Sequence, residues 1–239
     1  MTRTWHDDDL KASNEDINEL TEFGNFLKSK YEKDGMKLTD YYVDVHDYLG
    51  INLDFLIKGQ MGVSMIQYPT DIINSFSKDV DKPSPCSPCP TADHLYQVLD
   101  EKDTEYISEK KAWEFHHVTA QLLFLCNRAR RDIQTAVTVV FLTARVKQPD
   151  INDWGKLCRV LKYLKGSKYI KLVLTINDLS TIRWWVDALD RCHPDYQGHT
   201  GTMMSLGEGA IISSSRKQND NTKSLIKSEL VSLLMMHCP

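Results

Sequence analysis

The chain has 239 residues, of which 41% are hydrophobic and 26% are charged, the usual balance for a globular protein with a buried core. No apolar run reaches the length of a membrane span, and no basic-then-apolar leader opens the chain. We therefore expect an intracellular, cytoplasmic protein. Its six cysteines are scattered, which is typical of reduced thiols rather than of a disulfide framework.

Charge is unevenly distributed along the chain, although the net charge is only -4. Residues 1–105 carry 10 Lys and Arg against 21 Asp and Glu, whereas residues 106–239 carry 19 against 12. A basic half of this kind is typical of proteins that bind polyanions. Two differently solvated faces would produce the same asymmetry, so charge alone leaves both interpretations open.

The segment before residue 81 alternates between helical and strand-like patterns. Apolar residues recur at helical spacing from Ile17 to Tyr31, with Asn14 as the expected cap and Asp34-Gly35 as the end. Strands are then predicted at residues 41–45, 51–56 and 61–66. A helix combined with antiparallel strands predicts the α+β class.

Residues 82–91 form a proline-rich segment that is expected to be a linker. They hold four of the eight prolines, which excludes a regular helix or strand there. The same segment contains a Cys-x-x-Cys pair, Cys86 and Cys89. A zinc site of this kind needs a second pair at matched spacing, which the sequence lacks, so no zinc is expected.

Two helical regions with basic residues follow. Residues 109–146 have an apolar helical pattern, interrupted by Arg128, Arg130 and Arg131. Residues 151–165 predict an amphipathic helix, capped by Asn152 or Asp153 and ended by Gly166. Its cations, expected to face solvent, are Lys156, Arg159, Lys162 and Lys165. Such a helix suits binding to phosphates, a membrane surface or a partner, and it equally suits docking on a core with solvated lysines.

Beyond residue 168 the apolar period changes to two. Strands are predicted at residues 169–176, 182–187, 201–206 and 210–215, and a helix at residues 223–236. The last two strands are expected to form a hairpin around Gly207-Glu208-Gly209. The pattern therefore predicts a small antiparallel sheet followed by a helix.

Four stretches, taken together and in this order, resemble one family. They are HDYLGINLDF, FHHVTAQLLFLCNRARRDIQTAV, RVKQPDINDWGKLCRVLKYLKG and WWVDALDRCHPDYQGHTGTMMSLGEGAIISSSRKQ. They are similar to the Pol polyprotein of copia-type LTR retrotransposons, and they cover nearly the whole chain. The resemblance implies a partial reverse transcriptase palm at residues 1–81, the linker at 82–91, a helical thumb and connection at 92–181, and a partial RNase H-like fold of three strands and a helix at 182–239.

The opening stretch WHDDDLK resembles the catalytic hairpin of reverse transcriptases. The resemblance makes Asp8 and Asp9 the catalytic acids, which would hold Mg²⁺ or Mn²⁺, because nucleotide addition uses two metal ions and hard oxygen ligands. Asp7 departs from the apolar residue usual at its position, and its charge is expected either to disturb the hairpin or to reflect drift. From the residues alone, an acidic, solvated N-terminus is the simpler interpretation.

HDYLG resembles the primer-grip hairpin, in which Leu49 and Gly50 would present backbone to the primer end. An ordinary β-turn glycine is the alternative. The resemblance also places the basic residues of 92–181 near template-primer phosphates. These residues are Arg128, Arg130, Arg131, Lys156, Arg159 and Lys162. Arg131 stands where the family usually has proline, so the turn before Asp132 is expected to differ.

Asp187 and Glu229 resemble the first catalytic aspartate and the helix glutamate of RNase H, another site that uses two divalent metals. The resemblance makes both of them catalytic residues and metal ligands. Leu189 replaces the family's serine, and residues 225–228 depart from its Ser-Thr-Glu-Ala. A strand-end cap for Asp187 and a solvated helix position for Glu229 are the alternatives.

The implied function is that of a fragment of an RNA-directed DNA polymerase with RNase H. It would act on a template-primer or RNA–DNA hybrid with deoxynucleotides, in the cytoplasm, a virus-like particle or the nucleus. The family takes further aspartates from upstream and downstream segments, so both sites are expected to be incomplete and the isolated chain nearly inactive. The RNase H-like sheet is expected to expose an unpaired edge. A non-catalytic nucleic-acid-binding remnant and a decayed element's product are the alternatives.

Overall fold

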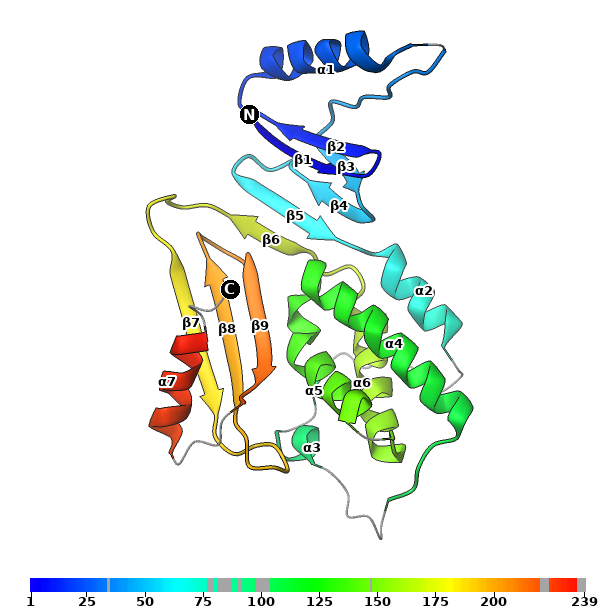
Figure 1. The fold of residues 1–239 in the computed structure, drawn as a ribbon, viewed down its shortest axis with the longest axis vertical. Helices are drawn as coiled ribbons and strands as arrows, with labels where there is room; N and C mark the ends of the chain where they lie inside the picture. The colour runs from blue at the N-terminus through cyan, green and yellow to red at the C-terminus, as the bar shows by residue number, and fades with distance from the viewer. Residues whose placement is uncertain are drawn as a thin grey trace.

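The computed structural model describes residues 1–33, 35–76, 80, 87–89, 92–97, 104–146, 148–219 and 224–235. Within these residues the chain is an α+β protein whose three sheets are antiparallel, as predicted. Figure 1 shows a hairpin and helix at one end, a central sheet, a group of helices below it, and a third sheet beside those helices. None of the described helices has the length and apolar character needed to span a bilayer.

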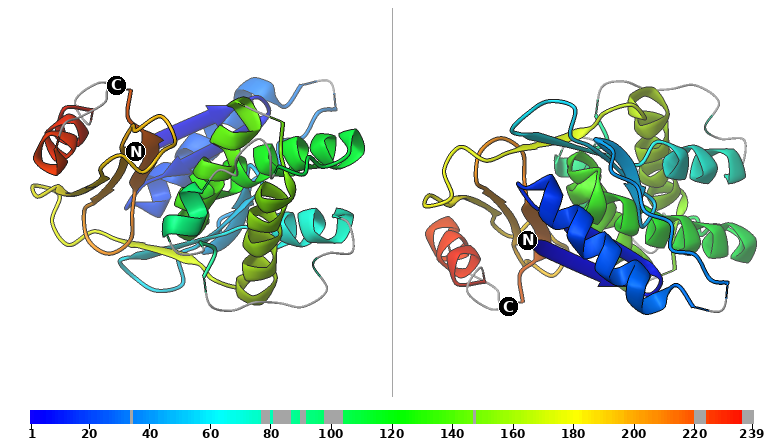
Figure 2. Two further views of the ribbon diagram at one scale, coloured as in Figure 1. Left: turned by 90° about the horizontal axis from the view of Figure 1, so that it is seen from below. Right: turned by 90° about the horizontal axis from the view of Figure 1, so that it is seen from above.

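The N-terminal end consists of a hairpin and one helix. Strands β1 (Thr2–His6) and β2 (Asp9–Ser13) pair directly, and α1 (Ile17–Tyr31) follows. The cap of α1 is Asp16 rather than the predicted Asn14, because the Asp16 carboxylate accepts a hydrogen bond from the Asn18 N–H. The helix was predicted correctly, yet it buries no residue, and Figure 2 shows it on the outside of the molecule.

The central sheet has the order β3-β4-β5-β6. Its strands are β3 (Val45–Tyr48), β4 (Ile51–Asp54), β5 (Gln60–Ser64) and β6 (Leu172–Thr175). The strand predicted at 41–45 is wrong. Asp40 forms an ion pair with Lys28 of α1, and the Tyr42 hydroxyl donates to Leu20 O of the same helix. Pairing with β4 begins only at Val45. The predicted strand at 169–176 is shorter and pairs with β5.

Helices pack beneath this sheet, most of them around one large hydrophobic core, with a small separate cluster formed by Leu95, Tyr96 and Val139. They are α2 (Gln67–Ser75), α3 (Ala92–Tyr96), α4 (Glu109–Arg128), the 3-10 turn η2 (Arg131–Ile133), α5 (Gln134–Val146) and α6 (Ile151–Ser167). The core joins Leu53 and Val63 of the sheet to Phe115, Leu122 and Leu161 of the helices. Parts of the segments 1–81 and 92–181 therefore share a core, to which β1, β2 and α1 contribute no buried residue. Of the proposed linker between them, Ser87–Cys89 are described, whereas Cys86 lies outside the described residues.

Helix α6 begins at Ile151, as predicted, but its cap differs from the prediction. Asp150, not Asn152 or Asp153, is its cap: the Asp153 N–H donates to the Asp150 carboxylate, and the Asp150 N–H donates to the Asp153 carboxylate. This reciprocal capping box satisfies backbone donors that are otherwise unpaired at a helix start. Gly166 does not end the helix, which continues to Ser167.

The third sheet has the order β7-β8-β9 and carries one helix. Its elements are β7 (Arg183–Leu189), β8 (His199–Ser205), β9 (Ile212–Lys217) and α7 (Leu225–Met235). Ser232 of α7 hydrogen-bonds to Thr200 on one face of the sheet. On the other face, Ser213 hydrogen-bonds to Arg131 and Gln134 of the core helices. Ser215 hydrogen-bonds to His199, whose ring lies against Tyr96 of α3.

The turn between β8 and β9 docks on the end of β6. The Thr175 N–H donates to Glu208 O at 3.0 Å, and the Glu208 N–H donates to the Thr175 hydroxyl at 2.6 Å. Gly209 has φ +76°, and a Cβ there would overlap the carbonyl oxygen of Val173. The close approach of the two sheets therefore depends on glycine at this position.

Candidate nucleic-acid interface

The acidic stretch at the N-terminus forms the tip of the β1–β2 hairpin. Asp7 and Asp8 make the turn, and His6 pairs across it with Asp9. Asp7 has φ 46°, in the left-handed region that aspartate tolerates better than most residues. The Trp5 indole N–H donates to Asp7 O at 2.6 Å and fixes this conformation. The residue that departs from the family pattern thus forms the turn, and the hairpin is intact around it.

The hairpin acids fit a metal ion only in part. Asp8 and Asp9 are both exposed, and they are adjacent carboxylates at the tip. No group of three His, Cys, Asp or Glu side chains within the described ranges could hold a metal ion. Mg²⁺ at nucleotide sites takes one or two carboxylates together with substrate phosphates. The hairpin tip therefore offers two carboxylates that could hold such an ion.

Leu49 and Gly50 form a tight turn between β3 and β4. Both lie in the left-handed region, with φ 52° and 74°, which matches the twist of a two-residue hairpin. A leucine in this conformation costs about 1 kcal/mol or more. The Tyr48 hydroxyl, next to this turn, donates to Thr4 O at 3.3 Å. This contact brings the Leu49-Gly50 hairpin beside the acidic hairpin, as Figure 1 shows for β1 and β3.

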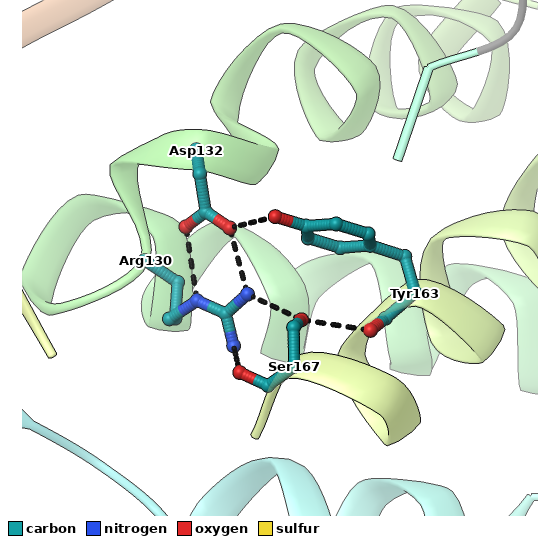
Figure 3. A network of polar contacts seen from close by, with 4 residues as sticks. All are labelled: Arg130, Asp132, Tyr163 and Ser167. Carbon is teal, nitrogen blue, oxygen red and sulfur yellow. Dashed lines mark hydrogen bonds and ion pairs between the residues drawn. The ribbon is translucent and has the colours of Figure 1, made fainter. Parts of the chain in front are cut away.

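Arg130 lies inside the protein and not at a phosphate-binding surface. It is 2% exposed, and its guanidinium makes two hydrogen bonds to Asp132, at 2.9 and 2.7 Å. It also donates to the backbone oxygen and the hydroxyl of Ser167, at 3.0 and 2.8 Å. The Tyr163 hydroxyl donates to the same Asp132 carboxylate at 2.9 Å, completing the network in Figure 3. Arg130 therefore ties η2 to the end of α6.

The Asp132 carboxylate stays charged in this setting. Burial on its own raises the pKa of Asp132, but the hydrogen bonds and positive charge of Arg130, helped by Tyr163, outweigh burial and lower it. Burial and the hydrogen bond to Asp132 raise the pKa of Tyr163. Sequence reasoning missed Asp132 as a partner, because the basic cluster around it was expected to lie near template-primer phosphates.

Arg131 joins the core helices to the third sheet. It is half-buried and donates to the Ser213 hydroxyl and to Ile211 O, both at 3.3 Å. Burial lowers the pKa of its guanidinium. Gln134 makes a second link, because its amide donates to Ser213 O at 3.2 Å and accepts from the Ser213 hydroxyl at 2.6 Å. The arginine in the family's proline position is thus an interface residue.

Helix α6 also directs cations inward. Lys156, predicted to face solvent, is buried, and its ammonium donates to Gln97 O at 2.9 Å and lies 3.4 Å from the Asp153 carboxylate. The Arg159 Nε–H donates to Ser87 O at 3.2 Å. Lys162 is half-exposed and makes no hydrogen bond or ion pair with any described residue.

Arg128, at the end of α4, is exposed. Its guanidinium lies 3.8 Å from the centroid of the Phe124 ring, a cation–π contact that leaves its donors directed to solvent. Of the six basic residues predicted to meet phosphates, Arg128 and Lys162 therefore present charge at the surface without an internal hydrogen-bond partner.

The two predicted RNase H acids lie on different parts of the third sheet unit. Asp187 is exposed and pairs across the sheet with Gly201. Helix α7 contacts the face of the sheet that carries Ala188 and Thr200. Side chains alternate along a strand, so Asp187 lies on the opposite face. Glu229 is exposed on α7, next to Ser228, which is fully buried. The fold does not bring the two carboxylates to one face.

A buried histidine pair was missed by sequence reasoning. His193 Nε2 lies 3.1 Å from His199 Nδ1, and His199 Nε2 lies 2.7 Å from the Ser215 hydroxyl. The Tyr96 ring packs edge-on against His193, with centroids 5.0 Å apart. Burial lowers the pKa of each histidine to about 4, and the neighbouring Lys217 and His193 add to the effect for His193 and His199 respectively. No local pattern in the sequence signals a pair that depends on loop closure.

Comparisons with protein-family models, with curated proteins and with solved structures gave no match to the chain.

Proposed function

We propose that the chain is part of a copia-type reverse transcriptase and RNase H, and that its own contribution is to bind a template-primer duplex. In this proposal residues 1–81 are the end of the palm, 92–181 the thumb and connection, and 182–239 the start of the RNase H-like fold. Asp8 and Asp9 are the acids of the polymerase site, and Asp187 is an acid of the RNase H site, to which Glu229 on the opposite face of the sheet does not contribute in this conformation. Mg²⁺ would supply two-metal phosphoryl transfer in the complete enzyme.

The observation that carries the proposal is the pair of adjoining hairpins. An exposed turn bearing Asp8 is held beside the Leu49-Gly50 turn by the hydrogen bond from Tyr48 to Thr4. Catalysis of nucleotide addition needs carboxylates close to the backbone that positions a primer end. Two tight turns at one edge are an arrangement suited to that task.

Phosphate contact is assigned to Arg128 and Lys162. Both belong to the core helices, and their charges are not consumed by internal ion pairs with described residues. Arg130 and Lys156 stabilise the fold from within, because their donors are already engaged. Neutralising phosphates releases counterions, so binding through these side chains should weaken steeply with salt.

A non-catalytic nucleic-acid-binding role is the second candidate. The observation that favours it is the incomplete metal site, since no three potential ligands gather among the described residues. Both candidates require binding to nucleic acid, and they differ in whether phosphoryl transfer appears when the polymerase is complete.

Binding is tested by fluorescence anisotropy with a labelled RNA–DNA hybrid at several salt concentrations. We expect salt-sensitive binding, and we expect Arg128→Ala to weaken it and to reduce the salt slope by about one unit. Lys30→Ala is the matched control, because it removes one surface cation from α1. Binding that ignores salt, or that both variants weaken equally, would count against the proposal.

Catalysis is tested by primer extension and by hybrid cleavage in Mg²⁺. The isolated chain is expected to show neither activity above background. An extension signal that Asp8→Asn abolishes, or a cleavage signal that Asp187→Asn abolishes, would show that the chain holds a working site and would exclude the non-catalytic candidate.

A further inference from the structure

Strand β7 is an unpaired edge. It pairs with β8 on one side, and no other described strand pairs with it, whereas β9 at the opposite edge lies against α5. Figure 1 shows β7 on the side of the third sheet that lies away from the core helices α4, α5 and α6, with α7 beside it. Five of its seven residues are exposed, including Trp184, Trp185 and Leu189 at 43%, 46% and 44%. An open edge of this kind offers a row of N–H and C=O groups to another strand.

The charges of this edge are spaced symmetrically about one residue. Arg183, Trp185 and Asp187 alternate along β7 and therefore share one face of the sheet. Arg183 has no ion-pair partner among the described residues, and the Asp187 carboxylate accepts a hydrogen bond from the N–H of the adjacent Ala188. Trp185 lies midway between the arginine and the aspartate.

We propose that two copies of the chain associate through β7, paired antiparallel with its own copy about a two-fold axis at Trp185. In this register Arg183 lies opposite the partner's Asp187, and the symmetry repeats the pair at the other end. The two copies of Trp185 face each other across the axis. The result is one continuous sheet in which both copies of α7 lie on the same face.

The register follows from the faces and the charges. The two-fold axis is perpendicular to the sheet, so residues paired across it must point to the same face of the joined sheet. The register can therefore shift only in steps of two residues. A shift in one direction puts Trp185 opposite the partner's Asp187, and a shift in the other puts Arg183 opposite the partner's Trp185. Each leaves the charges unpaired. A second copy is the favoured occupant because the strand is complementary to itself.

The test is sedimentation velocity of the full chain over a range of concentrations. We expect a monomer–dimer equilibrium that Arg183→Glu weakens by about tenfold or more, because each dimer then has two repulsive pairs instead of two attractive ones. Asp187→Arg should weaken it similarly. The double variant Arg183→Glu/Asp187→Arg restores both pairs and should return the dissociation constant to near its original value.

Arg216→Glu is the matched control, since it makes the same charge change at an exposed position of β9. Circular dichroism checks that each variant is folded, and the rescued double variant shows that neither change prevents folding. A chain that is monomeric at every concentration overturns the inference, as does a dimer that the single reversals leave intact or that the double variant fails to restore. Capture of a different protein by β7 with no self-association would also overturn it.

Discussion

Arg130 binds Asp132, two residues further along the chain, through two hydrogen bonds of 2.9 and 2.7 Å, and it does so from inside the protein. Arg130→Ala should lower the free energy of unfolding by about 3–5 kcal/mol, because Asp132 loses its cation and keeps only the Tyr163 hydroxyl as a donor, while Ser167 O loses the donor from Arg130. Urea denaturation measures this loss. Arg128→Ala, two residues away on the surface, should cost less than about 1 kcal/mol. Equal losses of unfolding free energy in the two variants would mean that Arg130 does not stabilise the fold by joining Asp132 to Ser167.

The buried histidine pair predicts an acid-sensitive stability. In the folded protein the pKa of His193 and of His199 is about 4, against an ordinary value of 6.5. Between these values the unfolded chain binds more protons than the folded one. The free energy of unfolding should therefore fall as pH drops from about 6.5 towards 4, and recover above 6.5.

Urea denaturation at several pH values between 7 and 5 tests this expectation. His199→Gln should flatten the pH dependence, because it removes one buried titrating group. His117→Gln removes an exposed histidine from α4 and controls for the loss of a histidine as such. An unchanged slope in His199→Gln would contradict the assignment.

Two glycines should respond in opposite directions to the same substitution. Gly209→Ala should destabilise the protein by roughly 2–4 kcal/mol, because the added methyl group meets the Val173 carbonyl and the backbone is left-handed there. Gly155→Ala lies within α6 with nothing within 4 Å of the new methyl group. It should stabilise the protein by about 0.5–1 kcal/mol. Thermal or urea unfolding of both variants checks the pair of signs.

Helix α1 should exchange its amide hydrogens much faster than α6. It buries no residue, and it is held by contacts such as the Lys28–Asp40 ion pair and the hydrogen bond from Tyr42 to Leu20 O. Native-state hydrogen exchange measures the difference. Asp40→Asn should speed exchange in α1 and leave α6 unchanged. Protection of α1 equal to that of α6 would indicate that another surface covers it in solution.

Sequence patterns located most of the elements, because local periodicity and turn residues determine where helices and strands occur. The apolar spacing from Ile17 to Tyr31 located helix α1, although its predicted cap and end lay outside the observed ones, and that apolar face is left at the surface. The strand run at 41–45 was misjudged because β-propensity says nothing about which segment finds a partner.

The candidate site was less accessible to sequence reasoning. Lys156 belongs to a helix whose cations were predicted to face solvent. Its ammonium instead donates to the backbone oxygen of Gln97, which comes from a distant segment of the chain. The hairpin at Asp7–Asp8 was implied by the family resemblance, whereas the residues alone favoured a solvated acidic segment; the chain does form a hairpin there. The partners of Arg130, Arg131 and His199 are set by packing between separate elements, which no spacing within a single stretch encodes.

Strand β6 closes the central sheet by pairing Gln60 with Thr175, so the sheet begins near one end of the chain and is completed only after all the core helices. During synthesis, β5 leaves the ribosome before β6, so the edge of β5 that pairs with β6 stays unpaired until the core helices and β6 have been made. Contacts between residues so distant in sequence close slowly. The newborn chain should therefore depend on chaperones until β6 emerges, and a ribosome stalled before that strand should carry an aggregation-prone nascent protein.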